Sequence, residues 1–282
     1  MNHLFCFGLG FCGKALAARL RQKGWRITGT SRDAAGAAAI HALGYESFIF
    51  DGAAPMPQHV FQGITHILVS VPPDRAGDPV LRTHENFLPD SLKWLGYLST
   101  TGVYGNRDGG WVSEESPLQP ATERGHRRLQ AEAAWLAKDG LPHIFRLAGI
   151  YGPGRNALVS LLKGSARRII KPGQVFSRIH VEDAAQVLEA SMAQPNAGRA
   201  YNVCDDEPCP PQDVIAHAAR LLKAPAPPET AFEEARLSPM AQSFYQESKR
   251  VSNARIKNEL GIELMYPTYR EGLASLLKGI KR

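Results

Sequence analysis

The fold is decided by the stretch Leu4-Phe5-Cys6-Phe7-Gly8-Leu9-Gly10-Phe11-Cys12-Gly13-Lys14-Ala15-Leu16. A short apolar run enters a G-x-G-x-x-G turn, and apolar residues then continue at helical spacing. The first glycine permits a tight strand-to-helix turn, Gly10 lets the backbone approach a pyrophosphate, and Gly13 lets helix and strand pack closely. The N–H groups at the helix start face the phosphates. The stretch therefore predicts a dinucleotide site built by Gly8, Gly10, Phe11, Cys12 and Gly13.

The end of the second apolar run indicates which dinucleotide binds. An NAD site usually places an acidic residue about 20 residues beyond the glycines, whereas an NADP site tends to place an arginine there. This chain has Thr30, Ser31 and Arg32 at that point. The guanidinium of Arg32 can hold a 2′-phosphate through two parallel hydrogen bonds. We therefore predict NADP, while the neighbouring Asp33 keeps NAD possible.

Composition narrows the class of protein. The chain has 282 residues, of which 44% are hydrophobic, and it can bury a sizeable core. No segment reaches the roughly 18 consecutive apolar residues of a membrane span. The four cysteines lack metal-binding spacing, so we expect no metal and a reduced, cytoplasmic protein. The net charge of +6 is spread among acids, which favours small anionic ligands over nucleic acid.

Strand-like runs alternate with helical patterns over the first half of the chain. The runs are 4–7, 26–30, 46–50, 66–71, 94–99 and 143–147. This alternation predicts an α/β fold of the Rossmann type, a doubly wound parallel sheet with helices on both faces. We expect a dinucleotide-binding domain over 1–155, to which segments near 175–205 return, and a smaller substrate-binding lobe over 156–282. The chain would be a monomer or a homodimer.

Four further segments carry a family resemblance. They are Tyr97 to Gly105 (YLSTTGVYG), Phe145 to Gly154 (FRLAGIYGPG), Arg178 to Ala185 (RIHVEDAA) and Tyr201 to Pro208 (YNVCDDEP). In this order they resemble the signatures of the extended short-chain dehydrogenases, the group of nucleotide-sugar epimerases and dehydratases. The resemblance spans most of the chain and is more specific than the glycine turn.

The resemblance implies roles for particular residues. Asp51 stands where the family contacts adenine, and Val71 and Pro72 lie along the cofactor's path. Thr100 falls on the family's catalytic serine or threonine; the alternative is a strand-end hydroxyl that bonds local backbone. The resemblance implies that His180 and Asp183 hold the two lobes together. It also assigns 247–261 to a late structural helix with a polar face.

The family's catalytic helix departs from its pattern here. The family reads Y-G-x-S-K-L-x-x-E, whereas this chain reads Arg124-Gly125-His126-Arg127-Arg128-Leu129-Gln130-Ala131-Glu132. The tyrosine position is Arg124 and the lysine position is Arg128. These two residues share a helical face, so both should point at the nicotinamide end of the cleft. Arg128 can still bind ribose hydroxyls, but Arg124 stays charged and cannot supply a proton.

Two functions remain open on this sequence. One is an NADP-dependent oxidoreductase or epimerase with altered acid–base chemistry. Its substrate would be anionic and carbohydrate-like, such as a nucleotide sugar, and Arg124 would hold it together with Arg127 or Arg128. Its acid would come from Tyr151, His126, the substrate or water. The other is a cofactor-binding protein without catalysis that senses NADP or serves a partner.

Overall fold

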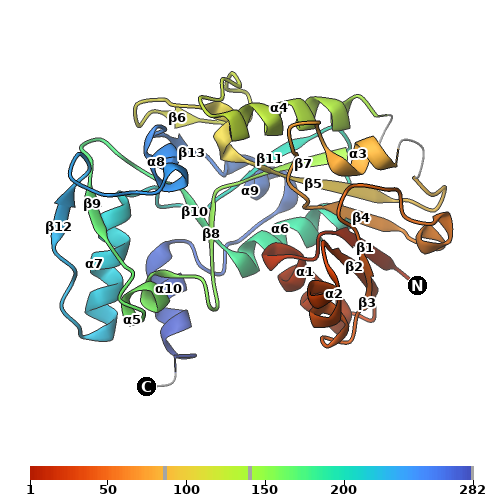
Figure 1. Cartoon of the computed structure of the whole chain (residues 1–282), viewed down its shortest axis with the longest axis horizontal. Coiled ribbons are helices and arrows are strands. Elements are labelled where there is room, and N and C mark those ends of the chain that lie inside the picture. The colour runs from red at the N-terminus through yellow and green to blue at the C-terminus, as the bar shows by residue number, and fades with distance from the viewer. Residues whose placement is uncertain (85–87, 139–141, 281–282) are drawn as a thin grey trace.

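The computed structural model describes residues 1–84, 88–138 and 142–280. A parallel seven-stranded sheet forms its centre, in the order β11-β7-β5-β4-β1-β2-β3 (Figure 1). The strands are β1 (His3–Phe7), β2 (Arg26–Ser31), β3 (Glu46–Ile49), β4 (His66–Val69), β5 (Trp94–Thr100), β7 (Pro142–Leu147) and β11 (Ala200–Val203). The predicted α/β fold with a doubly wound parallel sheet is confirmed.

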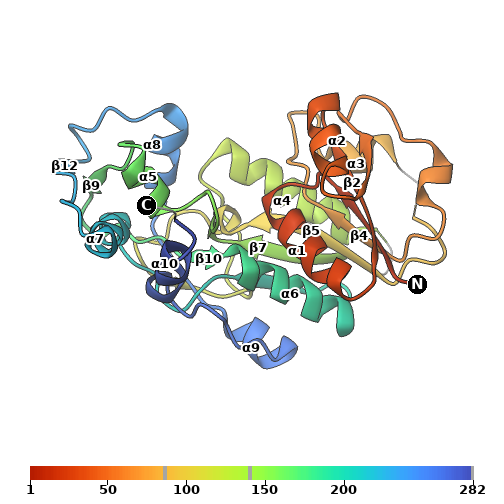
Figure 2. The same ribbon diagram turned by 90° about the horizontal axis from the view of Figure 1, so that it is seen from below.

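The sheet is covered by helices on both faces. The connecting helices are α1 (Phe11–Gln22), α2 (Ala34–His41), η1 (Gln58–Phe61), α3 (Pro79–Thr83), η2 (Thr101–Tyr104), α4 (Glu123–Leu136), α6 (Val181–Ala193) and α9 (Ala254–Leu260). Figure 1 shows α3 and α4 on one side of the sheet, and Figure 2 shows α1 beside α6 on the other.

Strand β1 is apolar throughout because both of its faces are buried. Leu4 and Cys6 pack with the residues of α1 and α6, whereas Phe5 and Phe7 pack with those of α3 and α4. Strand β1 lies between β4 and β2, so its carboxyl end is inside the sheet and not at its edge. The chain order reverses between β1 and β4, so the crevice beyond these strand ends is the expected ligand position.

A smaller group of elements lies to one side of the sheet, on the left in Figure 1. It contains α5 (Ala157–Leu162), β9 (Arg168–Ile170), α7 (Pro211–Leu222), β12 (Glu229–Ala231), α8 (Pro239–Tyr245) and α10 (Tyr269–Leu277). Leu158, Val214, Ala218 and Leu273 build its own buried core. We call this group the side lobe.

Short strand pairs join the side lobe to the sheet domain. β10 (Arg178–His180) pairs with β8 (Gly149–Tyr151), and β13 (Arg250–Val251) pairs with β6 (Trp111–Val112). The carboxylate of Asp183 in α6 also accepts hydrogen bonds from the backbone N–H groups of Met265 (2.7 Å) and Tyr266 (3.2 Å). Across the described residues, none of the helices has the length and apolar character needed to cross a bilayer.

Candidate active site

The glycine turn after β1 is built by backbone geometry. Gly8 has φ +80°, a conformation that favours glycine, and its N–H donates to Thr30 Oγ1 at 2.8 Å. The hydroxyl of Ser70, which follows β4, donates to the carbonyl of Gly8. A Cβ atom at Gly13 would lie 3.2 Å from Leu9 Cδ1, so helix and turn pack closely there.

The backbone of Gly10 faces open space. A Cβ atom at Gly10 would meet only the carbonyl oxygen of Gly8, at 4.0 Å. Gly10 is also the N-cap of α1 and supplies no side chain that would accept a hydrogen bond. Within the described part of the chain, the N–H groups of Phe11 and Cys12 in the first turn have no hydrogen-bond acceptor, as is usual at a helix start.

The predicted 2′-phosphate residues take different positions. Thr30 is 1% exposed and its hydroxyl accepts the N–H of Gly8, so its role is to hold the glycine turn. Ser31 packs against Gly36 at the start of α2, whereas Arg32 is exposed. The carboxylate of Asp33 accepts the N–H of Gly36 at 2.7 Å and caps α2. Thr30 is thus a buried turn residue, and Arg32 is the exposed cation.

The remaining cofactor candidates lie along the same edge of the sheet. Asp51 follows β3 and is exposed, and its carboxylate also accepts the N–H of Ala53 at 2.9 Å. Val71 and Pro72 follow β4, and Val71 Cγ2 would lie 3.3 Å from a Cβ atom at Gly8. Contacts of these residues with adenine and ribose stay predictions.

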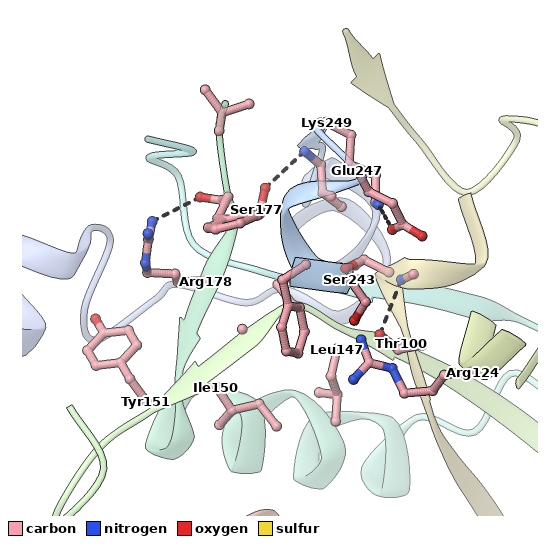
Figure 3. A pocket seen from close by; sticks show the side chains of 18 of the residues that line it. Thr100, Arg124, Leu147, Ile150, Tyr151, Ser177, Arg178, Ser243, Glu247 and Lys249 are labelled. Atoms are coloured by element: carbon pink, nitrogen blue, oxygen red, sulfur yellow. Dashed lines mark hydrogen bonds and ion pairs between the residues drawn. The ribbon is translucent and has the colours of Figure 1, made fainter. Parts of the chain in front are cut away.

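A cavity of about 610 Å³ lies between the sheet and the side lobe. It brings together Thr100, Arg124, Arg128 and Tyr151, which come from β5, α4 and β8. Figure 3 shows several of the side chains that line it. Apolar and aromatic residues form much of the wall: Leu147, Ala148, Ile150, Val175, Phe176, Phe244, Tyr245 and Val251.

Helix α4 presents Arg124 at the cavity. Thr122 caps the helix by accepting the N–H of Gly125 at 3.1 Å. A Cβ atom at Gly125 would lie only 2.8 Å from Pro120 Cβ, so this glycine sets the depth of the helix. The guanidinium of Arg124 stacks on the ring of Phe244 in α8, with Cζ 4.5 Å from the ring centroid. The Arg124–Phe244 stack therefore spans from α4 to the side lobe.

Arg128 is anchored beneath the cavity. Its Nη1 donates to the Tyr97 hydroxyl at 2.9 Å and to the Leu98 carbonyl at 2.8 Å. Arg124 and Arg128 both line the cavity, but these two hydrogen bonds tie the Arg128 guanidinium to β5, whereas that of Arg124 contacts an aromatic ring. Thr100 accepts the N–H of Gly102 at 3.2 Å and still lines the cavity. Both interpretations of Thr100 are thus compatible with its position.

The two candidate acids from the sequence are poorly placed. The Tyr151 hydroxyl lies 3.5 Å from the Thr268 carbonyl and packs against Gly272 of α10. Burial raises the pKa of Tyr151 well above its usual range, which makes it a weaker acid. His126 is exposed on α4 and is not among the residues that line the cavity.

Sequence reasoning missed two titratable residues of the cavity wall, Glu247 and Lys249. Residues 247–249 precede β13 and have no regular secondary structure, and the helix expected there, α9, begins only at Ala254. Lys249 donates to Glu247 at 2.6 Å and to the Gly105 carbonyl at 2.9 Å. Burial lowers the pKa of Lys249. No sequence motif predicts that Glu247 and Lys249 line the cavity, because the packing of the side lobe brings them there.

Comparisons with known proteins bear on the fold and the family. No family model matches the chain. A solved structure of a functionally unknown conserved protein from Silicibacter pomeroyi DSS is 52% identical, with 99% of each chain covered and a TM-score of 0.92. The chain belongs to the family of this Silicibacter protein.

Other proteins are similar at lower identity, and the names of two of them state an activity. The dTDP-glucose 4,6-dehydratase of Bacillus anthracis, solved in complex with NAD, is 17% identical and shares the fold with a TM-score of 0.78, covering 99% of this chain and 96% of its own. Protein YeeZ of Escherichia coli is 26% identical over 95% of this chain and 97% of its own. The 3-diazoavenalumate denitrifying reductase of a Streptomyces species is 25% identical over 97% of this chain and 99% of its own.

Proposed function

We propose that this protein is an NADP-dependent reductase that acts on an anionic substrate in the cavity between sheet and side lobe. The observation that carries this proposal is the position of Arg124, a stacked guanidinium without an ion-pair partner among the described residues. The reductase among the relatives supports the direction of the reaction. When bound, the reduced nicotinamide would supply a hydride.

The choice of NADP rests on Arg32. It is exposed at the carboxyl end of β2, and no hydrogen bond or ion pair of the described chain occupies its guanidinium. The adjacent acid, Asp33, is engaged in capping α2. A 2′-phosphate is the ligand group that matches an exposed guanidinium at this strand end.

The anionic substrate rests on Arg124. The guanidinium can donate two parallel hydrogen bonds to a carboxylate or phosphate. Arg124 also lies in the first turn of α4, where the helix dipole favours negative charge. The Phe244 ring limits the orientations of the guanidinium, which lowers the entropy lost on binding an anion.

Proton transfer rests on Lys249. Arg124 cannot release a proton, and the Tyr151 hydroxyl is packed against α10. Lys249 lies on the cavity wall, and its lowered pKa makes it a stronger acid than an ordinary lysine. In the proposed step, the substrate oxygen takes a proton from the Lys249 ammonium while Thr100 donates a hydrogen bond to it. Water then returns the proton to Lys249, and Glu247 holds its position.

The test is NADPH consumption with a panel of small oxo acids, aromatic acids with a reducible group, and nucleotide sugars. We expect turnover of an acid, with a rate that falls as pH rises through the lowered pKa of Lys249, because the ammonium is the active form. In Lys249→Met the rate should fall and this pH limb should disappear. A nucleotide sugar epimerised without NADPH loss would contradict the proposal.

A non-catalytic NADP sensor is the second candidate, and the arginine at the tyrosine position favours it. Tight NADPH binding without turnover of any compound in the panel would select the sensor.

A further inference from the structure

The loop between β8 and α5 holds Arg155 in a fixed position. Backbone hydrogen bonds join Gly152 N to Arg155 O (2.9 Å) and Arg155 N to Gly152 O (3.1 Å). The side chain of Asn156 donates to the Gly152 carbonyl at 2.8 Å and accepts the N–H of Val159 at 3.0 Å. These hydrogen bonds fix the backbone of the loop and therefore the position of the Arg155 Cα atom, from which the exposed side chain extends.

Arg155 lies at the glycine turn although it is far from it in sequence. Its Cζ atom is 5.8 Å from the ring centroid of Phe11, the first residue of α1. A Cβ atom at Gly152 would lie 3.2 Å from Phe11 Cζ, so the loop packs directly on this ring. The positive charge of Arg155 also opposes the rise that burial causes in the pKa of Cys12. Its charge thus reaches the first turn of α1.

Most cations of the cavity already have partners within the protein. Arg128, Arg178 and Lys249 each donate hydrogen bonds to oxygen atoms of the chain. Arg124 and Arg155, by contrast, contact aromatic rings, and the described residues give their guanidiniums no hydrogen bond or ion pair. The cavity therefore presents two available guanidiniums, one at α4 and one at the glycine turn.

We propose that Arg155 binds the pyrophosphate of the dinucleotide, opposite the N–H groups that open α1. The inference rests on the proposed cofactor site and adds a contact from outside the G-x-G-x-x-G turn. A guanidinium matches paired phosphate oxygens, and the N-terminus of α1 favours the same negative charge. The pyrophosphate is common to NADPH and NADH, so Arg155 should increase the affinity for both equally. Arg32, by contrast, should increase the affinity for NADPH alone.

The experiment measures dissociation constants of the full chain for three probes: NADPH, NADH and adenosine 2′-monophosphate, which lacks a pyrophosphate. The variants are Arg155→Gln, Arg155→Lys and, as a control for net charge, Lys163→Gln, an exposed lysine just after α5. Arg155→Gln should raise the dissociation constants of NADPH and NADH by about tenfold each, the effect expected from the loss of one charge-assisted contact. Adenosine 2′-monophosphate should bind Arg155→Gln and the parent protein with the same dissociation constant. Arg155→Lys should retain most of the affinity, and Lys163→Gln should match the parent.

The other outcomes separate this inference from the proposed function. Unchanged dinucleotide affinities in Arg155→Gln would overturn the inference and leave the cofactor site standing. Weaker NADPH and adenosine 2′-monophosphate with unchanged NADH would move Arg155 to the 2′-phosphate and also overturn it. A parent protein that binds neither dinucleotide would overturn both proposals. Thermal unfolding of each variant confirms that the exposed substitution leaves the fold intact.

Discussion

The glycine turn and helix α4, the two ends of the candidate site, are shaped by different parts of the chain: the first by backbone and the second by side chains. At the glycine turn, residues 8–13 shape the site through the backbone, with a positive φ at Gly8 and open space at Gly10. At α4, the site depends on side chains, and arginines stand at 124 and 128. The shape of the glycine turn is thus fixed by the backbone, whereas the α4 end of the site depends on a few side chains that can change without changing the fold.

Helix α4 shows how such a change leaves the fold intact. Gly125 fits against Pro120, and the buried carboxylate of Glu132 pairs with Arg146 at 2.9 Å. Glu132 also accepts a hydrogen bond from the hydroxyl of Ser99 in β5. These contacts hold the helix on the sheet independently of Arg124, which lines the cavity, and Arg128 adds its own hydrogen bonds to β5.

The largest expected effect is the loss of NADPH binding when Gly10 in the glycine turn is replaced. Gly10 has φ −86°, so valine fits the backbone, but its side chain would fill the space proposed for the pyrophosphate. Gly10→Val should weaken NADPH by more than about a hundredfold, a loss of about 3 kcal/mol. Fluorescence titration with NADPH measures it, and an unchanged melting temperature shows that the variant is folded. Binding equal to the parent would place the cofactor elsewhere.

A smaller effect is expected at Arg32, which we propose selects NADPH over NADH. Arg32→Ala should weaken NADPH by about tenfold to a hundredfold, because one charge-assisted contact with the 2′-phosphate is lost. NADH should bind equally to parent and variant. The matched control is Lys278→Ala, which removes one exposed positive charge from the end of α10. Equal weakening of NADH and NADPH, or a parent that prefers NADH, would contradict the assignment.

Sequence reasoning succeeded where local pattern determines structure. The apolar run before Gly8 predicts a buried central strand, and all six strands expected before residue 150 are present. It did not predict side-chain hydrogen bonds to distant parts of the chain. The Thr30 hydroxyl accepts the N–H of Gly8, and Arg128 donates to the Leu98 carbonyl. Lys249 reaches the cavity only through the packing of the side lobe, which no spacing along the chain encodes.

The third effect tests the α4 end directly. Arg124→Ala should raise the KM of the acid that the protein reduces by about tenfold, with NADPH affinity unchanged, because this guanidinium faces substrate. The same helix offers the control Arg127→Ala, since Arg127 pairs with Glu123 and does not line the cavity. Steady-state kinetics with both variants measures the difference. Equal effects of the two substitutions would show that general charge, not a contact, attracts the substrate.

The smallest expected effect concerns the ring that orients Arg124. Phe244 is 47% exposed, and its ring lies 4.5 Å from the guanidinium carbon. An exposed cation–π contact contributes about 0.5–1 kcal/mol, so Phe244→Ala should raise the KM of the same acid by about two- to fivefold. Met240→Ala is the control, because Met240 is exposed on the same helix and does not line the cavity. In the Arg124→Ala background, Phe244→Ala should have little further effect if the ring acts through the guanidinium. A full effect in both backgrounds would show instead that Phe244 contacts the substrate itself, and the chemical end of the site would then extend from α4 into the side lobe.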